Sequence, residues 1–220
     1  MRLKLKNTPE QVELIKAMGS KNSIVAREAS EAFAAFLGPV IQRVLQQAAT
    51  AGAIYTDEKE VLEFDIKNRY KVLREVIDES SQKVLVFVPF THVINILTDK
   101  LRAESITTEI IRGDVPAHKR TSIFKQFQES ADPQVLVIQP QAAAHGGTLT
   151  AANTIVWWGP TSSLETYDQA NARVHRSGQN HKCTVVQLQG SDAERHVYKL
   201  LDRRIDVHTK LTDLYKEILD

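Results

Sequence analysis

The sequence predicts an α/β fold in which a mostly parallel sheet is covered by helices on both faces. From residue 83 onward, strand-like runs alternate with segments that carry apolar residues at helical spacing. Several of the strand-like runs are continuously apolar, which is typical of parallel strands buried on both faces. The chain has 220 residues, of which 42% are hydrophobic and 25% charged, so it is long enough to bury a sizeable core.

The first strand of this regular part is the apolar run VLVFV at 84–88, which ends at Pro89. We expect Thr91 to cap the following helix, which runs to about residue 103. The other predicted elements are strands at 106–111, 135–138, 154–158 and 184–188, and helices from 116 to about 128, from about 163 to 175, and from 191 towards 219. The last helix begins with SDAE (191–194), which has the pattern of a capping box.

The first 80 residues have a different pattern. Apolar residues recur at helical spacing in 9–17, 30–49 and 68–79. Residues 60–66 alternate between acidic and apolar side chains, as in a short edge strand or an extended connection. We therefore divide the chain into a helical linker or insertion segment (1–80) and an α/β lobe (81–220).

Composition excludes several classes of protein. Twenty-eight Lys and Arg residues balance 27 Asp and Glu residues, so no global field points to nucleic acid, although a local basic groove would be enough to bind it. The single cysteine, Cys183, rules out an intrachain disulfide and fits a reducing compartment. No apolar run approaches the ~18 residues needed to span a bilayer, and the N-terminus lacks the apolar stretch of a signal peptide. We expect a soluble intracellular protein without a membrane partner.

The segment QANARVHRSGQ (169–179) contains two closely spaced arginines. Gln169, Arg173 and Arg176 are four and three residues apart, so on one helix ending at Gly178 their side chains would share a face. Two guanidinium groups on one face are suited to holding a polyphosphate, because each offers forked donors and a permanent charge. Spacing alone leaves open the alternative that these are unrelated arginines on a solvated helix face.

This segment resembles the last motif of superfamily 2 helicases, Q-x-x-G-R-x-x-R, in its Swi/Snf-type form Q-A-x-x-R-x-H-R-x-G-Q, with Ala172 in place of the glycine. The resemblance extends over 83–200. It includes the strand at 83–90, IRGD (111–114) with Arg120 and Phe127, LTAANT (149–154), and the stretch 185–200 with Glu194 and Arg195. The chain thus looks like the C-terminal RecA-like lobe of a bacterial or phage Swi/Snf-type DNA translocase, in which a helical segment such as 1–80 links the lobes.

The resemblance implies a role in ATP hydrolysis between two lobes. It makes Arg176 the arginine finger, Arg173 a second phosphate-facing or interlobe arginine, and Gln169 a polar partner that couples hydrolysis to lobe movement. The sequence contains no G-x-x-x-x-G-K-[ST], and DEKE (57–60) is better explained as a solvated charge run than as an acidic box. ATP and Mg²⁺ would therefore bind only with a first lobe, from a longer chain or a separate polypeptide, and the isolated chain is expected to be inactive.

The resemblance also implies a DNA partner, duplex rather than single-stranded. Gly146, Gly147 and Thr148 would approach the nucleic-acid backbone, and so would Phe90 and Thr91. The family's usual K-A-G-G is replaced here by QAAA (141–144), which removes its lysine. A simple connecting turn and a simple helix cap are the alternatives for these two places.

The remaining chemistry-bearing residues have structural explanations. Adjacent tryptophans, Trp157 and Trp158, are expected to pack in the fold rather than stack on a base. His175, His181 and Cys183 match no zinc spacing, so we expect no metal site. Cys183 is interpreted as a small buried hydrophobe rather than a nucleophile.

Three functions follow from these interpretations. The first is the second motor lobe of a DNA translocase, in the cytoplasm of a bacterial or phage-infected cell. The alternative is a non-catalytic DNA- or protein-binding module derived from such a lobe. An unrelated nucleotide-binding domain would need a glycine-rich loop after its first strand, and Pro89-Phe90-Thr91 is not one.

Overall fold

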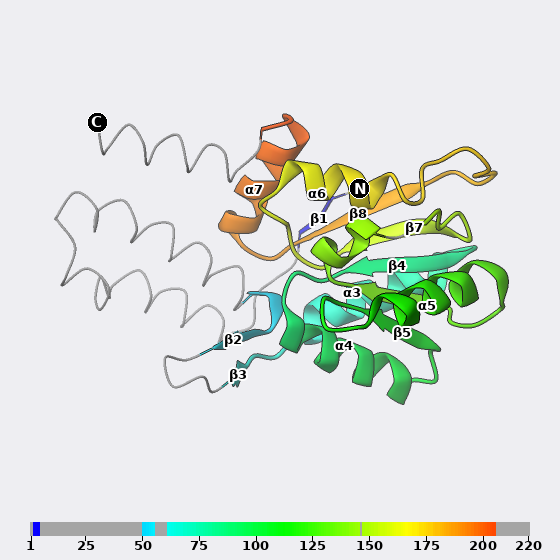
Figure 1. Cartoon of the computed structure of the whole chain (residues 1–220). Coiled ribbons are helices and arrows are strands. Elements are labelled where there is room, and N and C mark those ends of the chain that lie inside the picture. Colours follow the sequence, from blue (N-terminus) through cyan, green and yellow to red (C-terminus); the bar gives the residue numbers. More distant parts are fainter. Residues whose placement is uncertain (1, 5–49, 56–60, 146, 206–220) are drawn as a thin grey trace, which may run out of the picture.

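The computed structural model describes residues 2–4, 50–55, 61–145 and 147–205. The predicted helices within 9–17 and 30–49, the acidic run 57–60 and everything after residue 205 lie outside the described residues. The main sheet is six-stranded and wholly parallel, which confirms the predicted fold class (Figure 1). Its strands, in order across the sheet, are β1 (Arg2–Lys4), β8 (Thr184–Gln189), β7 (Ala152–Trp157), β4 (Lys83–Phe87), β6 (Val135–Ile138) and β5 (Thr108–Ile111).

Helices cover both faces of the sheet. Alternating residues of β4 divide the core: Val84 and Val86 face the cluster formed with α3 (Lys67–Glu79) and α4 (Thr91–Ala103). Leu85 and Phe87 face the opposite cluster, which is formed with α5 (Ala117–Glu129), the 3₁₀ helix η2 (Pro140–His145), α6 (Leu164–Asn171) and α7 (Asp192–Asp202). Because both faces are covered, the central strands need the continuous apolar runs from which they were predicted.

Two short strand pairs lie outside the regular β/α alternation. At the edge of the sheet, β1 pairs in parallel with β8, with Arg2 opposite Gln187 and Lys4 opposite Gln189. The N-terminal segment is therefore an edge strand of the main sheet. β2 (Ala53–Tyr55) and β3 (Val61–Glu63) form a separate antiparallel pair, which confirms a short strand within 60–66.

Several element bounds differ from the prediction, among them that of β7, which spans Ala152–Trp157 rather than 154–158. The N-cap of α4 is Phe90 and makes no side-chain capping bond, so Thr91 is the first helical residue rather than the cap. β5 begins at Thr108 rather than at residue 106. α7 has the predicted capping box but ends at Asp202, because Arg204 adopts a φ of 61° that cannot continue a right-handed helix.

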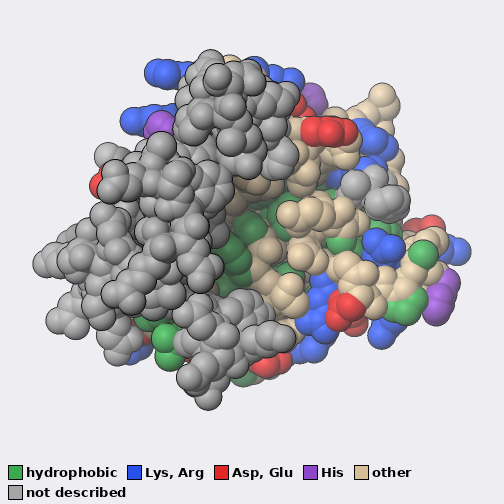
Figure 2. All heavy atoms as spheres, turned by 60° about the vertical axis from the view of Figure 1, so that its left-hand side comes forward, with side chains coloured by type: hydrophobic (Ala, Val, Ile, Leu, Met, Phe, Trp, Pro, Cys, Tyr) green, Lys and Arg blue, Asp and Glu red, His purple; other side chains and the backbone are tan. Residues whose placement is uncertain are grey.

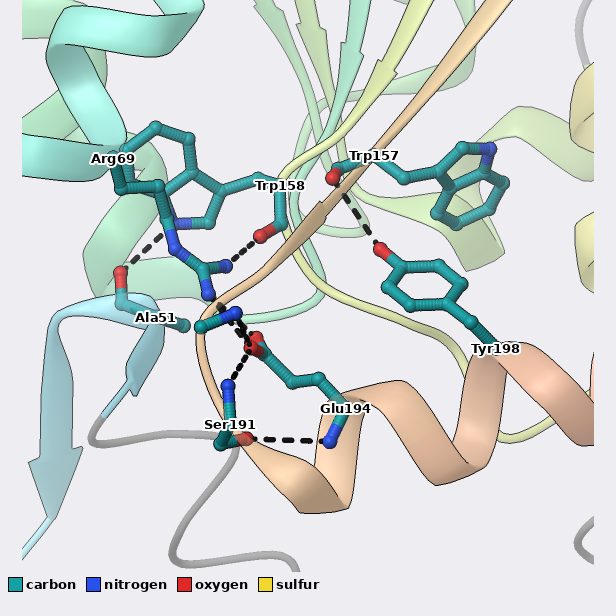
Figure 3. Close-up of polar contacts among 8 residues, drawn as sticks. Ala51, Arg69, Trp157, Trp158, Ser191, Glu194 and Tyr198 are labelled. Atoms are coloured by element: carbon teal, nitrogen blue, oxygen red, sulfur yellow. Dashed lines mark hydrogen bonds and ion pairs between the residues drawn. The ribbon is translucent and has the colours of Figure 1, made fainter. Parts of the chain in front are cut away.

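A buried ion pair joins α3 to α7 (Figure 3). Arg69 Nη2 donates to Glu194 Oε1 at 2.9 Å and to Oε2 at 2.7 Å, and the two side chains are only 4% and 0% exposed. Arg69 also donates to the carbonyl of Trp158 and lies over its indole ring, 5.5 Å from the centroid. Glu194 Oε2 accepts further bonds from the backbone N–H groups of Gly190 and Ser191.

The two tryptophans at the end of β7 point to opposite faces of the sheet (Figure 3). Trp158 joins the α3–α4 cluster and donates its indole N–H to Ala51 O at 2.8 Å. Trp157 joins the other cluster, where Phe87 and Tyr167 pack against its ring. Both side chains are fully buried. This confirms the packing interpretation and leaves neither ring accessible to a base.

We expect Glu194→Gln to lower the free energy of unfolding by about 3–5 kcal/mol, because it leaves the charge of Arg69 buried without its partner. Urea unfolding of the full chain would measure this loss. Lys71→Ala provides the control, since Lys71 and Glu75 form an exposed pair and such pairs contribute about 0.5 kcal/mol or less. Equal effects of the two variants would contradict the prediction.

Candidate functional site

The parallel sheet sorts the candidate residues into two groups. Residues that follow a strand lie at the carboxyl edge of a parallel sheet, and residues that precede one lie at the amino edge. Phe90 and Thr91 follow β4 and therefore belong to the carboxyl edge. Gly147 and Thr148 precede β7, and the segment 172–183 precedes β8, so both belong to the amino edge. The predicted nucleic-acid residues therefore do not form one cluster.

The two arginines are not on the helix from which they were predicted. α6 ends at Asn171, so Gln169, Arg173 and Arg176 do not share a helix face. Beyond it the chain tightens into turns, with Arg173 N bonded to Ala170 O at 3.2 Å and Val174 N to Asn171 O at 3.3 Å. The Asn171 carboxamide faces the core and accepts the indole N–H of Trp157 at 3.0 Å. Gln169 remains on the exposed helix, where its side chain donates to Glu165 at 2.8 Å.

The conformation of this turn explains why alanine can replace the motif glycine at position 172. Ala172 has φ −66° and ψ −9°, a right-handed helical conformation that alanine adopts without strain. Gly178 has φ +94°, which favours glycine, so it reverses the chain within the loop rather than ending the helix.

Arg173 and Arg176 concentrate positive charge at the amino edge. Arg173 is buried, with 9% of its surface exposed, and Arg176 is exposed. Burial lowers the pKa of Arg173, and repulsion from the Arg176 guanidinium lowers this pKa further. The two guanidinium groups are therefore close enough to oppose one another's charge. A site of this kind favours an anion that both can contact.

The segment that carries the arginines is bonded to the segment that precedes β7. Leu149 N donates to Arg173 O at 2.9 Å. The Gln179 carboxamide donates to Ala152 O at 2.8 Å and Thr150 O at 3.3 Å, and it accepts the His181 N–H at 2.9 Å. The sequence identified Gln179 only as part of the motif, because its acceptors before β7, Ala152 O and Thr150 O, lie more than 25 residues away.

Only part of the predicted loop lies in the described part of the chain. Gly146 lies outside the described residues. Gly147 and Thr148 are exposed, and a Cβ built on Gly147 would meet no atom within 4 Å. The backbone here is accessible to a ligand, and the phosphate contact itself stays a prediction.

At the carboxyl edge, Phe90 is half-buried and packs against the α3–α4 core, whereas Thr91 is exposed. Next to them, His92 Nε2 lies 2.7 Å from Glu63 Oε1, which connects α4 to β3. The part of the face in Figure 2 that is not drawn in grey carries Lys and Arg side chains as well as Asp and Glu side chains, so its charge has no single sign.

The remaining candidates, Cys183 and the two histidines near it, lie in the segment that precedes β8. Cys183 is half-buried against the α5–α7 cluster, and its Sγ lies 3.8 Å from His181 O. Over the described ranges, no three His, Cys, Asp or Glu side chains gather as metal ligands. In the same ranges, no helix combines the length and apolarity that a membrane span requires.

Comparison with known proteins agrees with the fold and with this motif order. Residues 68–178 match the family described as helicase conserved C-terminal domain. The chain belongs to this family. The match covers α3, the sheet from β4 to β7, and the arginine-bearing segment, and it confirms the resemblance to a superfamily 2 helicase C-terminal domain.

The curated relatives of this family member are much longer proteins. The chain is 28% identical over 148 residues to the bifunctional helicase and thymine dioxygenase JBP2 of Leishmania major, covering 64% of the chain and 13% of that protein. It is 27% identical over 150 residues to the ATP-dependent helicase fft2 of Schizosaccharomyces pombe, covering 66% of the chain and 12% of that protein. It therefore spans about an eighth of the length of these relatives.

Solved structures share the fold of this helicase C-terminal domain. The C-terminal part of the Fun30 ATPase domain superposes with a TM-score of 0.58 at 20% identity, covering 85% of this chain and 65% of that one. The C-terminal domain of the DEAD-box protein Dbp5 gives 0.54 at 20% identity, covering 62% of this chain and 77% of that one. Both agree with the predicted RecA-like lobe.

We expect Cys183 to react more slowly than an exposed thiol, because burial raises the pKa of its thiol and so reduces the thiolate fraction at a given pH. Iodoacetamide alkylation, followed by mass spectrometry from pH 7 to 10, would measure this. The same chain unfolded in urea is the control, since it contains one cysteine. A native midpoint at or below the unfolded midpoint would restore Cys183 as a candidate nucleophile.

Proposed function

We propose that this chain is the second motor lobe of an ATP-dependent DNA translocase of the Swi/Snf type that occurs in bacteria and phages. The observation that carries the proposal is the pair Arg173 and Arg176, whose guanidinium groups repel one another at the amino edge. Arg176 is exposed and forms no ion pair with a carboxylate among the described residues. It is therefore available to an anion supplied by another lobe.

The donor chemistry of these arginines fits ATP. An arginine next to the γ-phosphoryl group stabilises the negative charge that develops on this group during its transfer. ATP and Mg²⁺ bound to a first lobe would supply the reacting phosphoryl group. Arg176 acts as the arginine finger. Arg173, which is buried, supports it through a second positive charge. Gln169 is exposed one turn earlier and serves as a polar contact to the first lobe.

The proposed DNA contacts come from two places. Gly147 and Thr148 offer accessible backbone next to the arginine-bearing segment, and Phe90 with Thr91 offers a second contact at the opposite edge. Backbone N–H groups and hydroxyls position a phosphodiester backbone without reading its sequence. Duplex DNA is the proposed partner, together with a first RecA-like lobe in the same longer protein or in a separate polypeptide.

We expect the 220-residue chain alone to hydrolyse no ATP, and a first-lobe polypeptide with a phosphate loop to restore DNA-stimulated hydrolysis. Arg176→Ala should then lower kcat by about 10³-fold or more, because the developing charge loses its arginine. Steady-state phosphate release with and without duplex DNA would measure both effects. Arg203→Ala, at an exposed arginine beyond the end of α7, is the matched control and should leave kcat unchanged.

Two results would overturn the translocase proposal. Hydrolysis by the isolated chain would mean that it holds a complete ATP site. Duplex binding without turnover under any complementation would favour the non-catalytic binding module instead.

A further inference from the structure

We infer that Gln179 is a positioning residue that holds the arginine-bearing segment against the start of β7, and that this hold is needed for turnover rather than for folding. The inference rests on the proposed function of Arg176. It assigns a role to a side chain whose hydrogen bonds are all to backbone groups of this chain.

The Gln179 carboxamide uses both of its ends. Its Nε2 donates to Ala152 O at 2.8 Å, to Thr150 O at 3.3 Å and, at the longer distance of 3.5 Å, to Val174 O. Its Oε1 accepts the backbone N–H of His181 at 2.9 Å. One neutral side chain thus bonds to the turn before β7 and to both arms of the loop that carries Arg176.

Three bonds together fix the ends of this loop. Asn171 is held by the Trp157 indole at 3.0 Å, Arg173 O is held by Leu149 N at 2.9 Å, and the far end is held by Gln179. Arg176 lies between the second and third of these anchors. Removing the third leaves the loop bonded to the segment before β7 at one end only, so the Arg176 guanidinium would sample more positions.

The turn before β7 does not depend on Gln179 for its own structure. From α5, Gln128 donates to Thr150 Oγ1 at 3.1 Å and accepts the Ala151 N–H at 3.1 Å. Gln128 therefore anchors the same turn from the opposite side without contacting the arginine-bearing segment. Variants of the two glutamines therefore distinguish the effect of anchoring the turn before β7 from the effect of placing the arginine-bearing loop.

The same contacts connect the two proposed ligand sites. Thr148, in the proposed DNA contact, directly precedes Leu149, whose N–H bonds to Arg173 O. If DNA displaced this backbone, the hydrogen bond between Leu149 N and Arg173 O would therefore transmit the movement to the arginine-bearing segment. Gln179 limits how far the loop can move in response.

The test compares Gln179→Leu with Gln128→Leu in the full chain complemented by a first lobe. A misplacement of about 1 Å costs about 10²-fold in rate, so we expect Gln179→Leu to lower kcat by about 10- to 100-fold. The KM for ATP should stay within about twofold, because the first lobe provides ground-state binding. Gln128→Leu should leave kcat within about twofold, with a urea midpoint similar to that of Gln179→Leu.

Arg176→Ala is measured in parallel, so that the proposed function and this inference can fail separately. If Arg176→Ala leaves kcat unchanged, the arginine-finger assignment is wrong. If Arg176→Ala abolishes turnover while Gln179→Leu does not reduce it, or if Gln128→Leu reduces it equally, Gln179 has no positioning role. If Gln179→Leu does not fold, Gln179→Met replaces it. This variant keeps the length of the side chain, removes its donor without adding a charge, and should lower kcat to the same extent.

Discussion

The Arg69–Glu194 ion pair is the interaction on which the arrangement of the described helices depends. Two charges removed from water stabilise a fold only when their hydrogen-bonding capacity is used, and here the carboxylate also accepts two backbone N–H groups while the guanidinium also reaches a backbone carbonyl. Because α3 precedes strands β4 to β8 in sequence and α7 follows them, the pair brings the first and last described helices together at the carboxyl ends of β7 and β8. It adds to the packing of Leu73 and Ile77, which makes α3 part of the same core as the sheet.

At the amino edge of the sheet, neutral carboxamides rather than an ion pair connect segments that are far apart in the sequence. Asn171, Gln179 and Gln128 hold the segments before β7 and β8 by hydrogen bonds to backbone groups and to the Trp157 indole. Carboxamides do not titrate and carry no charge, so these contacts add nothing to the field around Arg173 and Arg176. A carboxylate at position 179 would still accept the His181 N–H, but it would add a negative charge to the segment that carries Arg173 and Arg176.

The separation of the two edges gives the lobe two surfaces with different properties. The amino edge combines exposed backbone with concentrated positive charge, and the carboxyl edge near β3 and α4 has mixed charges and a half-buried aromatic side chain. In the proposed motor the first of these surfaces faces ATP and part of the DNA, and the second contacts only DNA. The chain from η2 to β7 runs from the carboxyl edge to the amino edge and connects them.

Local patterns were sufficient for most elements of the fold. The apolar runs of β4 and β6, the spacing of α3 and α4 and the capping box of α7 all depend on neighbours within a few residues, and the family resemblance depended on the order of such patterns. The end of α6, the burial of Arg173 and the contacts of Gln179 were not predictable in this way. Helical spacing continues past Asn171, but Trp157, from a strand 14 residues earlier, binds the Asn171 side chain where the chain turns. The sequence by itself therefore determined which residues form strands and helices and which motif carries the arginines. Only the tertiary structure decided where those arginines point, because their placement depends on bonds between segments far apart in the chain.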